Sequence, residues 1–252
     1  MFKVEMHCHT YPASCDSHLT PDTLVRNAKE KGYDGIVVTN HFDMLQLAKF
    51  RKPLGPMCDW NCSKCVTKRT CTDIPDIDYA GCYDKWLSGI RETRIYAEKI
   101  GIKVFAGCEY SLSGHASHIS ILGLTIEEMW KERLQWLQPI KYLTGLKQRY
   151  PEILLICNHP DRNVCNPNPN EVDGFERFNT KYHENAKCDY LDILKDMMPP
   201  EVLCEKILIC GSDAHTDKEF GSSSILFEKE LANEKELCEE LKAHKYKMCI
   251  EV

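Results

Sequence analysis

The chain has 252 residues, of which 43% are hydrophobic, and a formal net charge of −6 at pH 7. This length and composition suffice for one large α/β core, and the negative charge argues against a general affinity for nucleic acid. No stretch is as long and apolar as a membrane span or a signal peptide, so we expect no membrane partner and a cytoplasmic location.

Strand and helix patterns alternate along the chain. In the first half of the chain we expect strands over 2–9, 34–41, 102–109 and 118–124 and helices over 21–31 and 84–101. In the second half we expect strands over 152–159, 171–177, 206–215 and 246–252, a helix over 126–150 that is bent or interrupted at Pro139, and a helix over 230–245. This alternation favours βα units around a parallel sheet or barrel, in one domain over residues 1–252.

Metal-competent side chains recur where these strands end. His7 and His9 alternate on the first strand and therefore face the same side. Later strands end in His41, Glu109, His159, and Asp213 with His215. Each residue alone has an ordinary explanation, such as a surface carboxylate, a turn residue or a helix cap. Their repetition predicts a shared metal site, because strand ends on one face of a barrel bring distant residues together.

Seven motifs follow one another along the chain: HCHT, CDSHLTP, TNHF, GCEY, HISILGL, NHPDR and GSDAHT. In this order they resemble the polymerase and histidinol phosphatase (PHP) superfamily of metal-dependent phosphoesterases. The resemblance extends from residue 4 to about residue 217. It implies a distorted (β/α)7 barrel of the PHP type, with up to three metal ions at the C-terminal ends of the strands.

Carried over residue by residue, the resemblance implies a ligand set for three ions. His7, His9, Glu109 and Asp213 would hold the first ion, Glu109, His118 and His159 the second, with Glu109 as the bridge, and Asp16, His41 and His215 the third. Imidazole and carboxylate ligands permit zinc, manganese or iron. We therefore expect two to three divalent ions of one or more of these metals.

Two of these ligand positions have competitors nearby in the sequence. His18 lies two residues after Asp16, in a motif where the family usually has glycine at the position of Ser17. His115 lies three residues before His118, in a loop rich in serine and glycine. Nearby loop residues can substitute for one another at a metal site, so both alternatives stay open.

The expected chemistry is hydrolysis of a phosphate ester. Three divalent ions and three carboxylates would leave the site with a charge of about +3, which attracts an anion. Ions also lower the pKa of water enough to supply hydroxide near neutral pH. Besides Glu109, Asp213 and His215, we expect Arg162 in the catalytic set, because its planar guanidinium can bind two phosphate oxygens; the alternative is a pair with a surface acid.

Residues 46–83 are the least family-like stretch and form a cysteine-rich, basic insertion. From Lys49 to Arg69 it has six basic residues and one acid, so it is either a lid that attracts substrate or a solvated loop. Four of its cysteines, Cys58, Cys62, Cys65 and Cys71, could bind a structural zinc ion or an iron–sulfur cluster, or stay free thiols.

The function that the sequence favours is a phosphoesterase acting on a small phosphomonoester or a nucleotide. The alternative is an accessory or regulatory PHP domain that binds metal without turnover, and the complete ligand set favours the enzyme. We expect no stable nucleic-acid partner, although oligonucleotides stay open as substrates.

Overall fold

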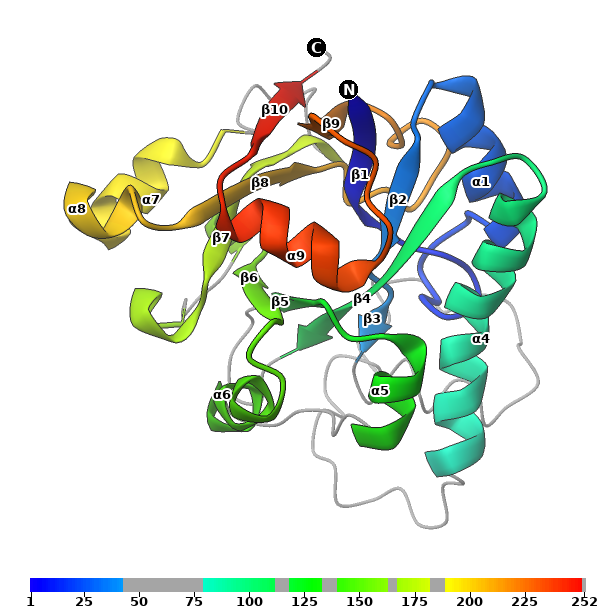
Figure 1. Cartoon of the computed structure of the whole chain (residues 1–252), viewed down its shortest axis with the longest axis horizontal. Helices are drawn as coiled ribbons and strands as arrows, with labels where there is room; N and C mark the ends of the chain where they lie inside the picture. Colours follow the sequence, from blue (N-terminus) through cyan, green and yellow to red (C-terminus); the bar gives the residue numbers. More distant parts are fainter. Residues whose placement is uncertain (43–78, 112–117, 133–139, 163–166, 182–188, 251–252) are drawn as a thin grey trace, which may run out of the picture.

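The structure is a computed structural model that describes residues 1–42, 79–111, 118–132, 140–162, 167–181 and 189–250. Within these ranges the strands join in one mixed sheet, and the sheet curls into a barrel-like wall with helices around it (Figure 1).

The wall begins with β1 (Phe2–Cys8). Its neighbours follow in the order β2 (Gly35–Val38), β4 (Lys103–Ser111), β5 (His118–Leu122), β6 (Leu154–Cys157), β7 (Gly174–Asn179) and β8 (Ile207–Gly211). Just after β8, Ala214 forms a bridge with Cys8, and the backbone N–H of His9 donates to the carbonyl of Ala214 at 3.0 Å. The wall thereby returns to β1, which confirms the predicted α/β barrel of the PHP type.

The sheet is mixed, and three of its strands depart from the parallel pairing that the alternation of strands and helices favours. β5 runs antiparallel to β4 and β6. β9 (Ser223–Phe227) pairs antiparallel with β1, and β10 (Tyr246–Ile250) pairs antiparallel with β9. Residues 112–117 between β4 and β5 are too few for the crossover that a parallel connection needs, which is about a dozen residues or more. Because β5 is reversed, its first residue lies at the end of the barrel where β4 finishes.

The predicted strand over 34–41 is divided in the structure. After β2, the short strand β3 (His41–Phe42) pairs with β4 and places His41 opposite Glu109. The two residues between β2 and β3, Thr39 and Asn40, instead form hydrogen bonds with the end of β1 and the loop after it. The backbone N–H of Thr39 donates to the carbonyl of Cys8 at 2.9 Å, and the side-chain oxygen of Asn40 accepts from the N–H of Thr10 at 2.6 Å.

Most helices lie outside the barrel wall (Figure 1). They are α1 (Pro21–Glu30), α4 (Tyr79–Glu98), α5 (Ile126–Glu132), α6 (Ile140–Arg149), α7 (Leu191–Met197) and α8 (Pro200–Leu203), with 3₁₀ turns at Pro160–Arg162 and Pro169–Glu171. α4 begins at Tyr79 and not at residue 84, so its first turn falls within the range predicted for the insertion. The sequence did not predict the short elements α7, α8 and β9, whose periodic patterns are too brief to detect.

The helix α9 (Glu234–Lys242) lies in front of the strands in Figure 1 and packs into one end of the barrel. The apolar cluster inside the barrel includes Val4, Met6, Val37, Phe105, Leu154 and Ile156, and from α9 it takes Leu237, Cys238 and Leu241. Gly123 just after β5 has a left-handed φ of 98°, and a Cβ there would lie 2.9 Å from Sγ of Cys238. α9 therefore fills the end at which β5 finishes, and the opposite end holds polar side chains.

The predicted start of this last helix at residue 230 is too early. The side chain of Asn233 accepts hydrogen bonds from the N–H groups of Lys235 and Glu236 at 3.1 and 3.0 Å, which fixes the first turn.

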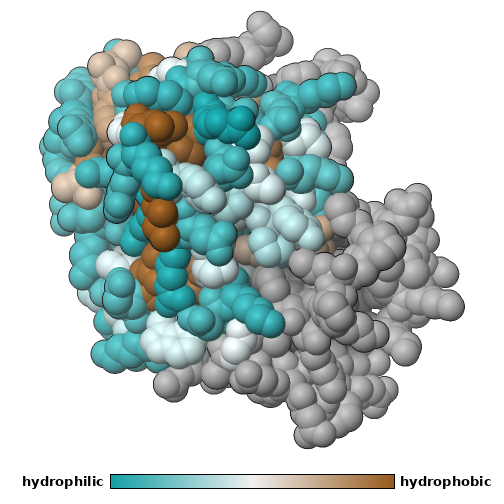
Figure 2. Space-filling view, turned by 90° about the vertical axis from the view of Figure 1, so that its right-hand side faces the viewer, coloured by the Kyte–Doolittle hydropathy of each residue, from teal (hydrophilic) through white to brown (hydrophobic). Residues whose placement is uncertain are grey.

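The flank that carries α1 and α4 is mostly hydrophilic, with apolar side chains in a narrow stripe and small patches (Figure 2). On or next to α4, Ile95, Tyr96 and Ile100 are exposed. Scattered apolar side chains of this kind are normal on a protein surface. In the part of the chain that the structure describes, no helix is long and apolar enough to cross a membrane.

Candidate metal centre

Nine side chains meet at the polar end of the barrel, where β1, β4, β6 and β8 finish. They are the imidazoles of His7, His9, His41, His118, His159 and His215 and the carboxylates of Asp16, Glu109 and Asp213. Three groups among them have candidate ligand atoms within 4.8 Å of one another: His7, His9 and Asp213; His9, His41 and His215; and His41, Glu109 and His118. The sequence predicted this set, and the structure brings all of it together.

Glu109 on β4 lies at the centre of the cluster and is fully buried. Its Oε2 is 2.6 Å from Nδ1 of His41, and its Oε1 is 3.1 Å from Nδ1 of His118 and 3.0 Å from Nε2 of His159. Burial raises the pKa of this carboxyl, but the nearby imidazoles outweigh burial and hold the pKa well below its usual value. Glu109 is therefore an anion whose two oxygens face different members of the cluster.

Asp213 lies just after β8 and faces the histidines of β1. Its Oδ1 is 3.2 Å from Nε2 of His9 and 3.6 Å from Nε2 of His7. Burial raises the pKa of Asp213, whereas His7 and Lys181 lower it, and the pKa ends well below the usual value. The backbone of Asp213 has a φ of 50°, and that of His159 a φ of 28°. Non-glycine residues in this region cost about 1–3 kcal/mol each, and such strain is typical of functional sites.

The turn after β1 brings Asp16 into the cluster, and not His18. Oδ2 of Asp16 is 3.2 Å from Nε2 of His41 and 3.1 Å from Nε2 of His215. Burial raises the pKa of Asp16, but these two imidazoles lower it far below its usual value. His18 is exposed, and only its backbone N–H reaches the site, where it donates to the carbonyl of His215 at 2.7 Å.

Several candidate ligand atoms are buried and form no hydrogen bond among the described residues, although charged neighbours lie close to some of them. They include Nε2 of His7, Nε2 of His9, Oδ1 of Asp16, Oε2 of Glu109 and Nδ1 of His118. In addition, Nε2 of His41 and Nε2 of His215 face each other at 3.3 Å. A buried polar atom without a partner costs about 1–3 kcal/mol. Divalent ions coordinated by these lone pairs would remove that cost, so the residues fit a metal centre.

The sequence missed a buried carboxylate behind the cluster, Glu176 on β7. Its Oε1 is 2.9 Å from Nδ1 of His7, while Oε2 accepts from the backbone N–H of His159 at 2.9 Å and from Nδ2 of Asn179 at 3.0 Å. Nδ2 of Asn179 is also 3.3 Å from Oδ2 of Asp213. A single carboxylate thus orients three candidate ligands. The sole signal in the sequence is an acid between apolar residues of a predicted strand.

A second buried acid, Glu5 on β1, joins this strand to the segment after β8. Its Oε1 accepts from the backbone N–H groups of His7 at 3.0 Å and Ser212 at 2.9 Å. Burial raises the pKa of Glu5 to about 7, although the same N–H groups partly oppose this rise. Glu5 holds the backbone under the two histidines of β1 in place.

Several predicted residues lie outside the described part of the chain. These are His115 and the four cysteines Cys58, Cys62, Cys65 and Cys71. The backbone of Arg162 ends the 3₁₀ turn after His159, but its side chain is also outside the described part. The expectations for these residues therefore stay predictions.

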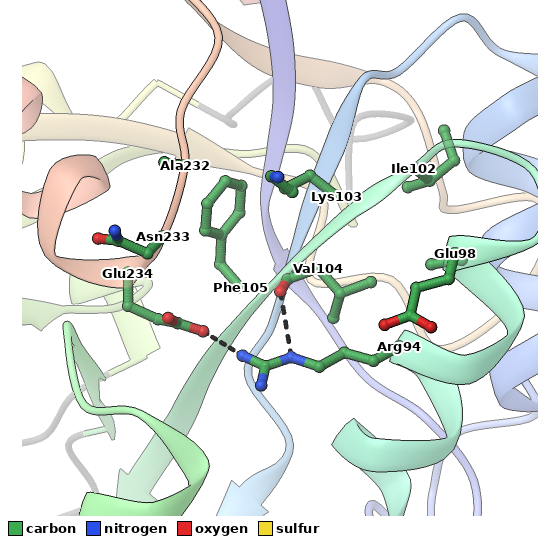
Figure 3. A pocket seen from close by; sticks show the side chains of 10 residues that line it. Arg94, Glu98, Ile102, Lys103, Val104, Phe105, Ala232, Asn233 and Glu234 are labelled. Atoms are coloured by element: carbon green, nitrogen blue, oxygen red, sulfur yellow. Dashed lines mark hydrogen bonds and ion pairs between the residues drawn. The ribbon is translucent and has the colours of Figure 1, made fainter.

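A cavity of about 330 Å³ lies elsewhere, between α4, β4 and the start of α9 (Figure 3). There the guanidinium of Arg94 forms an ion pair with Glu234, and its Nε donates to the carbonyl of Val104 at 3.4 Å. Oε1 of Glu234 also accepts from the backbone N–H of Ala106 at 3.0 Å. These contacts hold α4 and the start of α9 against β4.

Known proteins share the family and the fold of this chain. The profile of the PHP domain matches residues 5–252. PsfC from Pseudomonas syringae PB-5123 is 16% identical, with a TM-score of 0.60 over 99% of this chain and 91% of that chain. A candidate metal-dependent phosphoesterase from Bifidobacterium adolescentis is 13% identical, with a TM-score of 0.52 over 94% of each chain.

A two-domain protein from Bacteroides vulgatus, which contains a predicted PHP-like metal-dependent phosphoesterase, is 16% identical, with a TM-score of 0.54 over 99% of this chain and 65% of that chain. No curated protein sequence is detectably similar to this chain. At these identities the structural likeness supports the fold alone, whereas the domain profile covers nearly the whole sequence. The chain belongs to the PHP domain family.

Proposed function

We propose that this chain is a metal-dependent phosphoesterase that hydrolyses a small phosphomonoester or a nucleotide. The observation that carries the proposal is the convergence of six imidazoles and three carboxylates at one end of the barrel, with buried lone pairs that lack hydrogen-bond partners in the described part of the chain. The similar structures described as metal-dependent phosphoesterases support the same activity class.

The proposed ligand set has three parts. His7, His9, Glu109 and Asp213 hold one ion, Glu109, His118 and His159 a second, and Asp16, His41 and His215 a third. When bound, divalent zinc, manganese or iron supplies a water of lowered pKa and Lewis-acid stabilisation of the phosphoryl oxygens.

The surrounding residues fix which ring nitrogen of three histidines, His7, His9 and His215, faces the cluster. Nδ1 of His7 is hydrogen-bonded to Glu176 at 2.9 Å, Nδ1 of His9 to Oγ of Ser14 at 3.1 Å, and Nδ1 of His215 to the carbonyl of Asp213 at 2.7 Å. A proton held on Nδ1 leaves the lone pair of Nε2 directed into the site. This arrangement prepares three imidazoles to act as ligands.

Charge favours an anionic substrate at this site. Nearby imidazoles hold the pKa values of Asp16, Glu109 and Asp213 well below their usual range, which favours the ionised form of all three carboxylates. Against them, two divalent ions leave a net charge of about +1 and three leave about +3. Both net charges are positive, so the site would attract a phosphate ester with two ions or with three.

The experiment is an assay of the purified protein with 4-nitrophenyl phosphate and manganese. We expect hydrolysis that is abolished by a chelator and restored by added manganese. A panel of phosphorylated metabolites and nucleotides then identifies the leaving group. If the metal-loaded protein hydrolyses none of these esters, the phosphoesterase proposal is wrong and the chain is a metal-binding accessory domain.

A further inference from the structure

A lysine that the sequence analysis did not single out reaches the metal centre from the end of β7. The ammonium of Lys181 is 3.6 Å from Oδ1 of Asp213 and 2.8 Å from Nδ1 of His215, and its side chain is 15% exposed. The ammonium therefore lies close enough to contact the cluster, and the side chain is exposed enough to contact a ligand.

Nδ1 of His215 cannot accept a hydrogen bond from this ammonium, although the two nitrogens are close. Nδ1 of His215 is also 2.7 Å from the backbone carbonyl oxygen of Asp213. A carbonyl oxygen can only accept, so Nδ1 must carry the proton and cannot accept a second one from Lys181. Among the described residues this leaves Oδ1 of Asp213 at 3.6 Å, which is longer than the 2.7–2.9 Å of a charge-assisted hydrogen bond.

The position of the charge shows what the ammonium could bind. The same Oδ1 of Asp213 lies 3.2 Å from Nε2 of His9 and 3.6 Å from Nε2 of His7, the nitrogens proposed as ligands of the first ion. A cation at the edge of a site built for divalent cations raises the electrostatic energy of the loaded site. An anion bound between the ions and the ammonium would lower that energy again.

We propose that Lys181 contacts the substrate directly and binds a phosphoryl oxygen of a phosphomonoester dianion. This rests on the proposed function and narrows its substrate class. A monoester dianion has three non-bridging oxygens and two negative charges, whereas a diester has two such oxygens and one charge. An additional cation in the site favours the monoester.

The test compares Lys181→Gln with Lys181→Arg, which keeps the charge, and with Lys195→Gln as a matched control. Lys195 is half exposed on α7, where it forms an ion pair with Asp192 at 3.1 Å. Each variant is loaded with manganese, its metal content is measured, and its dissociation constants for inorganic phosphate and dimethyl phosphate are determined by calorimetry. KM and kcat for 4-nitrophenyl phosphate complete the set.

We expect Lys181→Gln to keep its metal, which also shows that it is folded. The loss of a hydrogen bond to a charged group should weaken the binding of inorganic phosphate at least about tenfold. It should raise KM for 4-nitrophenyl phosphate by a similar factor. Dimethyl phosphate should be affected less, Lys181→Arg should retain most of the affinity, and Lys195→Gln should match the unmodified chain.

Two results would overturn the assignment of Lys181. Unchanged phosphate affinity in Lys181→Gln with full metal content would mean that the ammonium does not contact the anion. Loss of metal from Lys181→Gln would make the residue a positioning partner of Asp213 instead. Phosphate affinity is measured without turnover, so a chain that binds phosphate through Lys181 but hydrolyses no ester would refute the proposed function alone.

Discussion

Replacing Glu109 with glutamine is expected to remove at least one bound ion and to lower kcat/KM for an aryl phosphate at least about a thousandfold, beyond the 10–100-fold typical of residues that only support ligands. The reason is the central place of this carboxylate, whose two oxygens approach His41, His118 and His159 within 3.1 Å. An amide has no charge and one acceptor oxygen, so it cannot bridge two cations. Elemental analysis and steady-state kinetics measure the two losses.

The matched control is Glu92→Gln, because Glu92 is exposed on α4 and takes no part in the cluster. This variant should keep its metal and its activity. His115→Gln is the second comparison, and we expect it to lose less metal and less activity than Glu109→Gln. Equal losses from the changes at residues 109 and 115 would show that the ligand set around β4 and β5 is wrong.

The second large effect is expected from Glu176→Gln, although Glu176 is not among the proposed ligands. Its two oxygens accept from His7, from the backbone of His159 and from Asn179. Glutamine keeps the shape but replaces one acceptor oxygen with an NH2 group, so at least one of these donors would face another donor. We expect metal affinity to fall about 10–100-fold, as for other partners of ligating histidines.

Competition with a coloured chelator measures that affinity. A positioning role predicts that activity recovers substantially when manganese is raised to saturation, whereas loss of a true ligand would not be rescued in this way. Unchanged affinity in Glu176→Gln would show that the carboxylate does not orient the ligands, and Glu92→Gln again serves as the control.

Seven of the nine proposed ligands could be predicted from strand patterns because each is polar and stands where an apolar run ends, whereas Asp16 and His118 were predicted only from the resemblance to the PHP superfamily. In β6, four buried residues from Leu154 to Cys157 are followed directly by Asn158 and His159. The HxH pattern of β1 likewise places its two imidazoles together, with ring centres 5.1 Å apart. Local patterns of this kind predict which residues lie together, because the ends of the barrel strands lie close to one another in space.

The residues around the ligands could not be predicted in this way, because their burial depends on neighbours distant in sequence. Glu176 fits against His7 only because β8 has glycine at position 211, where a Cβ would lie 2.4 Å from Cβ of His7 and 2.9 Å from Oε1 of Glu176. The reversed direction of β5 and the approach of Lys181 to Asp213 also depend on tertiary packing. Strand periodicity does not encode any of these features.

The most direct measurement of the central claim is the metal content of the full chain purified without chelator. The nine converging side chains predict two to three divalent ions of zinc, manganese or iron per chain, and fewer in Glu109→Gln than in Glu92→Gln. Less than one ion per chain, in protein that is folded and remains unloaded after incubation with these metals, would contradict the account.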